Sequence, residues 1–521
     1  MQRRHGGIAV HALALPLSAP RGAIAPYLAT AGAVAALAAW ILAAPGPNGL
    51  FSDSIDYLVY AEFFRGGSAG DANAARLLQA YFAETRFPPG YPALLALVGA
   101  SFANPAPALP FAAACWLLGG IAMIAWVRRL GAGVGLATAI GLAYAAGPQR
   151  FFSMLTPHSE SVFVPALVGL LATREAAWSR TTGLVAWCLA VGLMPLVRAP
   201  AIALVLAALV GLALLRERSR GPRVAAALAL LAPSIAWAAL RATLKVSGGY
   251  GESLADLLAD PAAFAHSTLV NLANLAPAIG ASLLQGPVWL RAVLGAALAF
   301  AAIAWFARSW REDPVAPLFC ILYAGIFVVW PFPAEADRLA MPLAAVGLVA
   351  IAGTMQRARP LAQGSVALVV VVVATFSLAQ LALRMRVSVP NDQLAYQRTQ
   401  MYFDAPSGEA ARTIARLIKV NVDSMRLTPD IVAPGSCVYT KFHAFLYEQT
   451  RGRLRTRPFP DDLSAAGATC RYALVTRMTA AQDADPPFWP LDRIEARTRR
   501  VAAAPGEQPG SFDALLLEFV R

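Results

Sequence analysis

Long apolar runs separated by short polar connections dominate the chain up to residue 384. A helix needs about 20 apolar residues to cross a bilayer, and somewhat fewer where it is buried among other helices. The pattern therefore predicts an all-α polytopic membrane domain with about eleven transmembrane helices. These predicted spans are 24–44, 107–127, 133–148, 158–173, 182–197, 199–215, 223–241, 288–307, 314–331, 339–355 and 363–383.

The pattern changes after residue 384. Strand-like runs at 437–440, 472–476 and 514–520 alternate with polar stretches that suit helices. We therefore predict two domains, a membrane domain over 1–384 and a small soluble α/β domain over 385–521.

Two connections of the membrane domain are long. The first, at 45–106, contains an apolar stretch at 88–102 directly before a complete span. We interpret this stretch as a re-entrant or interfacial helix, because counting it as a span would reverse every later connection. The second is a loop at about 242–287.

Composition and charge fit a membrane protein and set its orientation. With 58% hydrophobic and 14% charged residues, the chain is too apolar for one or two ordinary soluble domains. Its net charge of +13 does not indicate nucleic-acid binding, because the cations are not interleaved with aromatic residues. Most cations instead occupy alternate connections, which the positive-inside rule places in the cytoplasm. The clusters are Arg3 and Arg4; Arg128 and Arg129; Arg174 and Arg180; Arg216, Arg218, Arg220 and Arg223; Arg308 and Arg311; Arg357 and Arg359.

In this orientation the N-terminus is cytoplasmic. We expect the chain to lie in the cell (inner) membrane. The first long loop and the C-terminal domain then lie outside the cytoplasm, where thiols can be oxidised. Cys437 and Cys470 are the two cysteines of that domain, each at the edge of a strand-like run, and we predict that they form a disulfide. The alternative is two unrelated thiols. None of the five cysteines has a spacing that suggests zinc.

Acidic and aromatic residues follow the first predicted span. A short helix starting at Asp53 would place Asp53 and Asp56 on one face, beside Tyr57. In a purely structural interpretation, Asp53 caps the helix and Asp56 complements its dipole. In a catalytic one, a carboxylate acts as general base at the membrane surface, where desolvation and nearby cations set its pKa.

Three further candidates lie in the external loops. The proline-rich turn at 86–92 would bring Tyr91 near the acidic pair. His158 and Glu160 lie at the external end of the fourth predicted span, where ionisable groups are costly unless paired or solvated in a cavity. We expect Glu160 in such a cavity, whereas His158 is either a cavity residue or a simple surface histidine.

Two arginines break the positive-inside pattern. Arg198 lies between two apolar runs on the external side, and Arg338 lies at an external helix start beside Glu335 and Asp337. External cations at helix junctions suit the binding of an anion. Alternatively, Arg198 reaches lipid headgroups and Arg338 forms a local ion pair.

The order of these motifs resembles that of the GT-C glycosyltransferases. It comprises an acidic residue with tyrosine after the first span, a Pro-Pro-aromatic turn before an apolar helix, a glutamate-bearing fourth span, a cation between the fifth and sixth spans, and a late Arg-x-x-x-Pro. The resemblance covers about residues 24–355 and is closest to the branch of bacterial aminoarabinose transferases and protein O-mannosyltransferases.

The resemblance implies a helical bundle with an external cavity and a polyprenyl-phosphate sugar as donor. It implies that Asp53 is catalytic, that Glu160 is a second acidic site residue, and that Arg198 and Arg338 lie near the donor phosphate. Tyr57, Tyr91 and His158 are then expected to contact substrate.

Two positions depart from the relatives. Ser54 stands where many have glutamate, and Leu339 stands where they have tyrosine. A divalent metal is therefore compatible with the sequence but not required by it.

The expected function is transfer of a hexosyl or pentosyl group from the lipid donor to an extracytoplasmic glycolipid, polysaccharide or protein, with inversion. Phosphate is a good leaving group, so arginines can stabilise the developing charge without a separate general acid. One alternative is a polytopic transporter or lipid flippase, against which the long acidic loop and the lack of evident inverted repeats argue. The other is a polysaccharide ligase or polymerase with an oligosaccharide donor.

Overall fold

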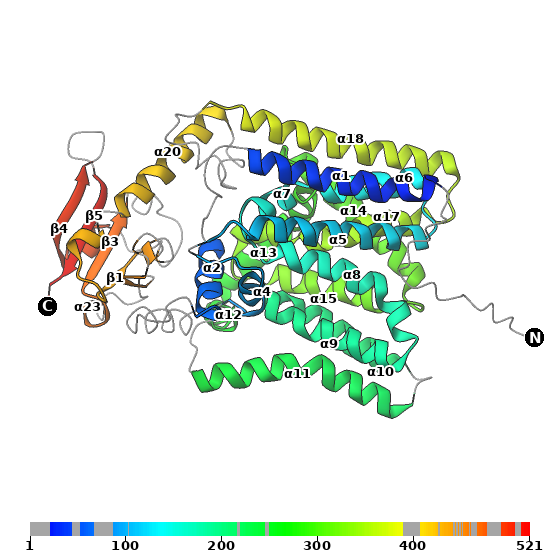
Figure 1. Ribbon diagram of the computed structural model, residues 1–521, viewed down its shortest axis with the longest axis horizontal. Coiled ribbons are helices and arrows are strands. Elements are labelled where there is room, and N and C mark those ends of the chain that lie inside the picture. The colour runs from blue at the N-terminus through cyan, green and yellow to red at the C-terminus, as the bar shows by residue number, and fades with distance from the viewer. Residues whose placement is uncertain are drawn as a thin grey trace, which may run out of the picture.

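A bundle of long helices carries a smaller α/β domain at one end (Figure 1). This computed structural model describes most of the chain. The described residues are 21–43, 53–66, 87–102, 104–215, 219–244, 250–388, 407–425, 428–440, 443, 446–447, 450, 452–457, 459, 466–476, 491–505 and 512–520. Arg3, Arg4, Arg216 and Arg218 of the predicted cytoplasmic clusters, and residues 67–86 of the first loop, lie outside them.

Each predicted span coincides with an apolar helix. Six of these helices are long and apolar enough to cross a membrane: α1 (Arg21–Ala43), α5 (Ala108–Arg129), α8 (Glu160–Trp178), α11 (Arg220–Leu244), α14 (Val288–Ser309) and α18 (Pro360–Met385). Five are shorter: α6 (Val134–Ala146), α9 (Thr181–Val197), α10 (Ile202–Leu214), α15 (Val315–Val328) and α17 (Met341–Thr354). The helical membrane bundle is therefore confirmed, whereas eleven crossings remain a prediction.

The bundle has a buried centre and an apolar exterior. All residues of α17 except Ile351 and Thr354 are buried, so this helix lies at the centre. By contrast, Leu228 of α11, Phe300 of α14 and Leu368 of α18 are 65%, 74% and 65% exposed. Apolar side chains that point outward on several long helices are typical of a surface in contact with lipid.

One segment departs from the sequence prediction. The region predicted as a loop at 242–287 contains α12 (Tyr250–Ala259) and α13 (Pro261–Ala281). Asp260 caps α13, because its carboxylate accepts hydrogen bonds from the backbone N–H groups of Ala262 and Ala263, both at 3.0 Å. The Asp-Pro pair at 260–261 is a helix-start signal that the hydropathy pattern did not use.

The helix α13 packs tightly against α14. A Cβ atom on Gly280 would overlap the carbonyl oxygen of Arg291, and one on Gly295 would overlap that of Ala276. Glycine at these two positions therefore allows the two backbones to approach each other.

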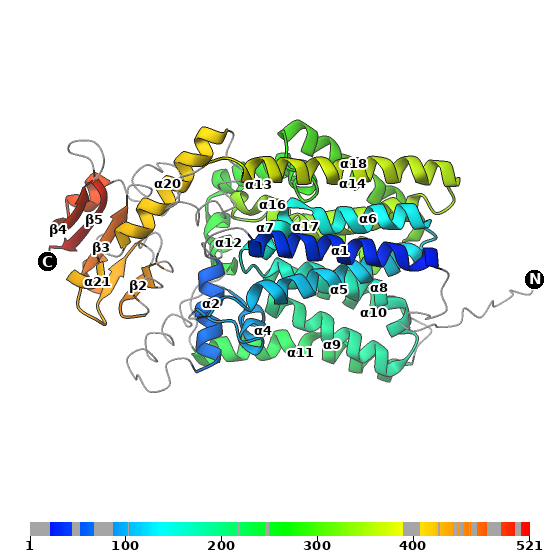
Figure 2. The same cartoon turned by 45° about the horizontal axis from the view of Figure 1, so that its top comes forward.

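Several short helices gather at the end of the bundle that faces the C-terminal domain. Among them are α2 (Asp53–Phe64), α4 (Gly90–Leu97) and α12, as both views show (Figures 1 and 2). Burial raises the pKa of Tyr447 in the C-terminal domain to about 12, and the carboxylate of Glu62 in α2 adds to this shift. The described helices of the first long loop, α2 and α4, and the C-terminal domain therefore lie at the same end of the bundle.

The C-terminal domain is built on a five-stranded mixed sheet in the order β2-β1-β3-β5-β4. Its strands are β1 (Cys437–Tyr439), β2 (Arg455–Arg457), β3 (Tyr472–Thr476), β4 (Thr498–Pro505) and β5 (Phe512–Phe519). The strand β1 is parallel to β2 and β3, whereas β5 is antiparallel to β3 and β4. The accompanying helices are α20 (Gly408–Met425), α21 (Thr428–Ile431), α23 (Ala466–Thr469) and α25 (Leu491–Glu495).

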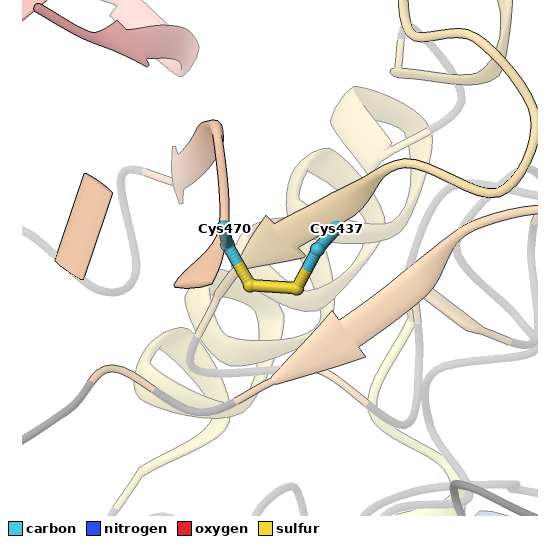
Figure 3. The surroundings of a disulfide bond; sticks show 2 residues. All are labelled: Cys437 and Cys470. Carbon is cyan, nitrogen blue, oxygen red and sulfur yellow. A yellow bond between two sulfur atoms is a disulfide. The ribbon is translucent and has the colours of Figure 1, made fainter. Parts of the chain in front are cut away.

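The predicted disulfide joins Cys437 and Cys470 (Figure 3). Cys437 begins β1 and Cys470 lies two residues before β3, so the bond links the starts of two neighbouring strands. Their Cα atoms are 4.6 Å apart. The two cysteines are 33 positions apart in the sequence, and the segment between them contains β2.

Candidate active site

Five breaks between helices supply the side chains of the site. They are the start of α2, the start of α4, the turn before α8, the junction of α9 with η1 (Ala199–Ala201), and the short helix α16 (Ala336–Leu339) that follows η2 (Pro333–Glu335). Prolines stand at four of these breaks, at positions 89, 157, 200 and 333. Because proline lacks a backbone N–H group, it favours helix ends and turns at such positions.

Two ion pairs bring together residues that are far apart in the sequence. Asp53 Oδ2 is 2.9 Å from Arg338 Nη2, across 285 positions of the chain. Glu160 Oε1 is 2.7 Å from Arg198 Nη1 and 3.7 Å from Arg338 Nε. Glu160 is only 1% exposed. Arg338 and Glu160 therefore join the two pairs into one buried network, in which each charge has an opposite partner.

A third carboxylate completes this network. Glu335 Oε1 is 3.4 Å from Arg338 Nη2, so the network contains one more carboxylate than guanidinium. Burial alone would lower the pKa of Arg338, but Asp53, Glu160 and Glu335 together raise that pKa well above its usual value. Burial alone would also lower the pKa of Arg198. The negative charge of Glu160 outweighs this effect, so the pKa of Arg198 is raised. Both guanidinium groups therefore stay positive throughout the working pH range.

Hydroxyl and aromatic groups surround the charges. The hydroxyl of Tyr57 donates to Ser159 Oγ at 3.3 Å, and Arg198 Nη1 donates to the same oxygen at 3.1 Å. The rings of Tyr57 and Tyr91 meet edge to face, 4.9 Å apart. Tyr91 reaches this place because α4 lies directly on α9, where a Cβ atom on Gly90 would overlap the backbone of Leu196.

His158 lies beside the network as a neutral group. Burial and the positive charge of Arg338 lower its pKa to about 4. Its Nδ1 atom is 3.1 Å from Thr156 Oγ1, and that hydroxyl donates at 2.9 Å to the carbonyl oxygen of Phe152. Because a hydroxyl has one proton to donate, this arrangement assigns the proton of the neutral ring to Nδ1 and a lone pair to Nε2.

The structure thus brings together seven of the eight candidate residues. These are Asp53, Tyr57, Tyr91, His158, Glu160, Arg198 and Arg338. Asp56, the eighth, lies in the first turn of α2 and is partly exposed, and the ion pairs described above do not include it.

The surroundings of Arg198, Arg338 and His158 bear on the alternatives that the sequence left open for them. Arg198 is 8% exposed and bonded to Glu160, so it does not extend to the lipid headgroups. Arg338 does form a local pair with Glu335, but it also pairs with Asp53 across the bundle. His158 is 7% exposed, which rules out a simple surface histidine.

Sequence reasoning missed two residues of the site. Ser159 receives two hydrogen bonds, and Tyr323 of α15 lies beside the guanidinium of Arg198. Glu335 was named only as a local partner of Arg338. Within the part of the chain that the structure describes, no group of three or more His, Cys, Asp or Glu side chains could hold a metal ion.

The chain was compared with known proteins. No family model and no curated protein sequence matches it. ArnT from Cupriavidus metallidurans bound to undecaprenyl phosphate superposes with a TM-score of 0.52 and 15% identity, over 96% of this chain and 98% of ArnT. Its apo state gives the same score and identity over 95% and 98%. The chain has the GT-C fold.

A more distant likeness is to the archaeal oligosaccharyltransferase AglB from Archaeoglobus fulgidus, in complex with an inhibitory peptide and a dolichol-phosphate. Its TM-score is 0.47 at 13% identity, over 86% of this chain and 69% of AglB. The alignment with ArnT extends over nearly all of both chains, so the shared GT-C architecture includes the C-terminal domain as well as the bundle.

Proposed function

We propose that this chain is a membrane glycosyltransferase that transfers a sugar from a polyprenyl-phosphate donor to an acceptor outside the cytoplasm. The observation that carries the proposal is the buried network in which a carboxylate, Asp53, and two permanently charged guanidinium groups, Arg198 and Arg338, lie together. A displacement that releases a phosphate needs such a set, with one proton acceptor and fixed positive charge for the leaving group.

In the proposed reaction, an acceptor hydroxyl oxygen attacks the anomeric carbon while the bond from that carbon to the phosphate oxygen breaks. Asp53 takes the hydroxyl proton, and the phosphate leaves with its polyprenyl chain. Attack from the side opposite the phosphate inverts the anomeric carbon. Arg338 and Arg198 stabilise the negative charge that develops on the phosphate.

The remaining site residues have supporting roles in this scheme. Glu160 holds Arg198 at 2.7 Å and so orients a phosphate-binding group. Tyr57, Tyr91 and His158 offer hydroxyl and imidazole groups for contacts with the sugar or the acceptor. Asp56, which is partly exposed in the first turn of α2, is retained as a second acidic residue three positions from Asp53.

The fold supports the nature of the donor. ArnT, which shares this fold, has been observed with undecaprenyl phosphate bound. Because a polyprenyl chain lies in the bilayer, its enzyme must present the catalytic groups at the membrane surface. The helix α2, which carries Asp53, lies at one end of the bundle (Figures 1 and 2). We place this end outside the cytoplasm, in the cell membrane.

The proposal is tested with purified protein in bilayer discs, a donor labelled in its sugar, and an extract of envelope glycolipids and polysaccharides as acceptor. We expect release of polyprenyl phosphate and transfer of the label to the acceptor. Asp53→Asn should abolish both. The matched control is Asp313→Asn, which alters another acid paired with an arginine, 3.1 Å from Arg174 and remote from the site.

Two results would overturn the proposal. Movement of intact donor across a vesicle membrane without cleavage would indicate a transporter or flippase. Cleavage restricted to donors that carry an oligosaccharide would indicate a ligase or polymerase.

A further inference from the structure

Arg338 lies on a short and irregular segment. Between the end of α15 at Val328 and the start of α17 at Met341, the chain forms only a three-residue 3₁₀ helix and the four-residue α16. Such short helices supply few backbone hydrogen bonds of their own, so other parts of the molecule must fix the direction of the guanidinium.

Asn271 of α13 holds the beginning of this segment. Its Nδ2 atom donates to the carbonyl oxygen of Trp330 at 2.7 Å and to that of Val328 at 3.1 Å. The Asn271 side chain is 1% exposed, so water does not compete for these bonds. Both carbonyl groups lie at the C-terminal end of α15, where a helix leaves carbonyl oxygens without partners.

A second set of contacts leads from Trp330 to the cation. The indole N–H of Trp330 donates to Glu335 Oε2 at 3.3 Å. The other oxygen of the same carboxylate, Oε1, is 3.4 Å from Arg338 Nη2. The residue that Asn271 fixes thus also orients a carboxylate partner of Arg338.

Arg291 holds the end of the segment. Its Nη1 atom, in the first turn of α14, is 3.2 Å from Oδ2 of Asp337, the neighbour of Arg338. The backbone of Arg291 is itself fixed by the close approach of α13 at Gly280. Arg291 and Asn271 therefore hold the segment from two helices that pack tightly against each other.

We propose that Asn271 and Arg291 are positioning residues that fix Arg338 and thereby set the affinity of the site for the phosphate of a polyprenyl phosphate. This inference rests on the proposed function, in which Arg338 binds the donor phosphate. Neither residue touches the phosphate. In metal sites, residues that orient the ligating side chains typically contribute about tenfold to a hundredfold to affinity or activity, and we expect an effect of similar order here.

The test measures binding of polyprenyl phosphate, without sugar, to the full chain in bilayer discs. We expect Arg291→Gln and Asn271→Leu each to weaken binding on the order of tenfold. The decisive variants carry the same substitutions together with Arg338→Ala. A positioning residue acts through Arg338, so its effect should disappear in that background, whereas a general loss of packing would persist.

The matched control is Arg174→Gln, which removes an ion pair of similar length to that of Arg291, 3.1 Å against 3.2 Å, outside the site. Binding in this variant should stay within about twofold of wild type, a change of less than 0.5 kcal/mol. Unchanged affinity in Arg291→Gln and Asn271→Leu, or a loss that persists without Arg338, would overturn the inference while leaving the proposed function intact. If the unmodified chain does not bind polyprenyl phosphate, both proposals are wrong.

Discussion

Glu160→Gln preserves the shape of a side chain but removes a charge that two guanidinium groups share. Glu160 is 1% exposed, 2.7 Å from Arg198 and 3.7 Å from Arg338. Arg198 also donates to the Ser159 hydroxyl at 3.1 Å and lies near two tyrosines, whereas Arg338 repels it. The substitution therefore leaves a buried guanidinium without an anionic partner among the described residues. Breaking one side of a buried ion pair costs about 3–5 kcal/mol of stability.

Asp53→Asn should lose less stability than Glu160→Gln but more transfer activity. Arg338 would lose a partner at 2.9 Å but would keep Glu335 at 3.4 Å and Glu160 at 3.7 Å. The cost in stability should then be close to that of one hydrogen bond to a charged group, about 1.5–3 kcal/mol. Transfer activity, however, should fall by roughly a hundredfold or more, because the proposed base is gone.

The two amide variants can be compared in one pair of assays. Unfolding of the purified proteins in mixed detergent micelles gives the difference in free energy of unfolding, and release of polyprenyl phosphate gives the activity. We expect Glu160→Gln to be the less stable protein and Asp53→Asn, although folded, to be the less active per folded molecule. Equal stability of Glu160→Gln and wild type would refute the reasoning from the buried network. Activity of Asp53→Asn within about tenfold of wild type would refute its role as the base.

Three further predictions concern the donor, the histidine and the disulfide. Arg198→Ala and Arg338→Ala should raise the KM for donor far more than that for acceptor in steady-state assays, and unchanged donor dependence in both would remove them from the phosphate site. The pKa of His158 in the folded chain is lowered to about 4, whereas in the unfolded chain it has the ordinary value of about 6.5. The stability that His158 contributes should therefore be complete above about pH 6.5 and decline as the pH falls toward 4. Unfolding of His158→Gln should lack this component, and an identical pH dependence in wild type and variant would contradict the assignment. Replacing Cys437 and Cys470 by serine should destabilise the C-terminal domain by about 3 kcal/mol, measurable by its unfolding, whereas an unchanged midpoint would show that the bond is dispensable.

Hydropathy was sufficient to locate the helices of the bundle, because a segment that crosses lipid must be apolar along most of its length. The segment around Asn271 shows where this reasoning stops. The helix α13 carries polar residues such as His266, Ser267 and Asn271, and it is not among the helices that are long and apolar enough to cross a membrane. Asn271 is nevertheless buried, because its amide satisfies two carbonyl groups of another helix. That partnership depends on tertiary contacts, which a hydropathy window does not include.

The C-terminal domain shows a similar division. The strands β1, β3 and β5 lie at the centre of the sheet and are rich in Val, Leu and Tyr, so their sequences predicted them. The edge strands β2 and β4 read Arg-Thr-Arg and Thr-Arg-Arg-Val-Ala-Ala-Ala-Pro, and neither was predicted. Charged residues are common on edge strands, where they discourage pairing with other chains. Because charged residues have a low strand propensity, such strands are not predicted from propensity.

For the site, the sequence indicated which residues matter but not how they pair. Asp53 was predicted to be a base and Arg338 to bind the donor phosphate, and the structure places the two side chains in contact. Their distance in the chain, 285 positions, carries no signal in a single sequence. The predicted sidedness limited the candidate site residues to the external connections and the external ends of the spans.

The pairing of Asp53 with Arg338 has a consequence for the order of events. The proposed base, Asp53, and the proposed phosphate-binding group, Arg338, form an ion pair at 2.9 Å. A donor phosphate that binds Arg338 competes with Asp53 for the same guanidinium, and an anion near Asp53 increases its affinity for a proton. Binding of the donor would thus make Asp53 a stronger base at the moment when an acceptor can be used. The ion pair also gives the buried Asp53 carboxylate an opposite charge, while Glu335 and Glu160 remain as further partners of Arg338.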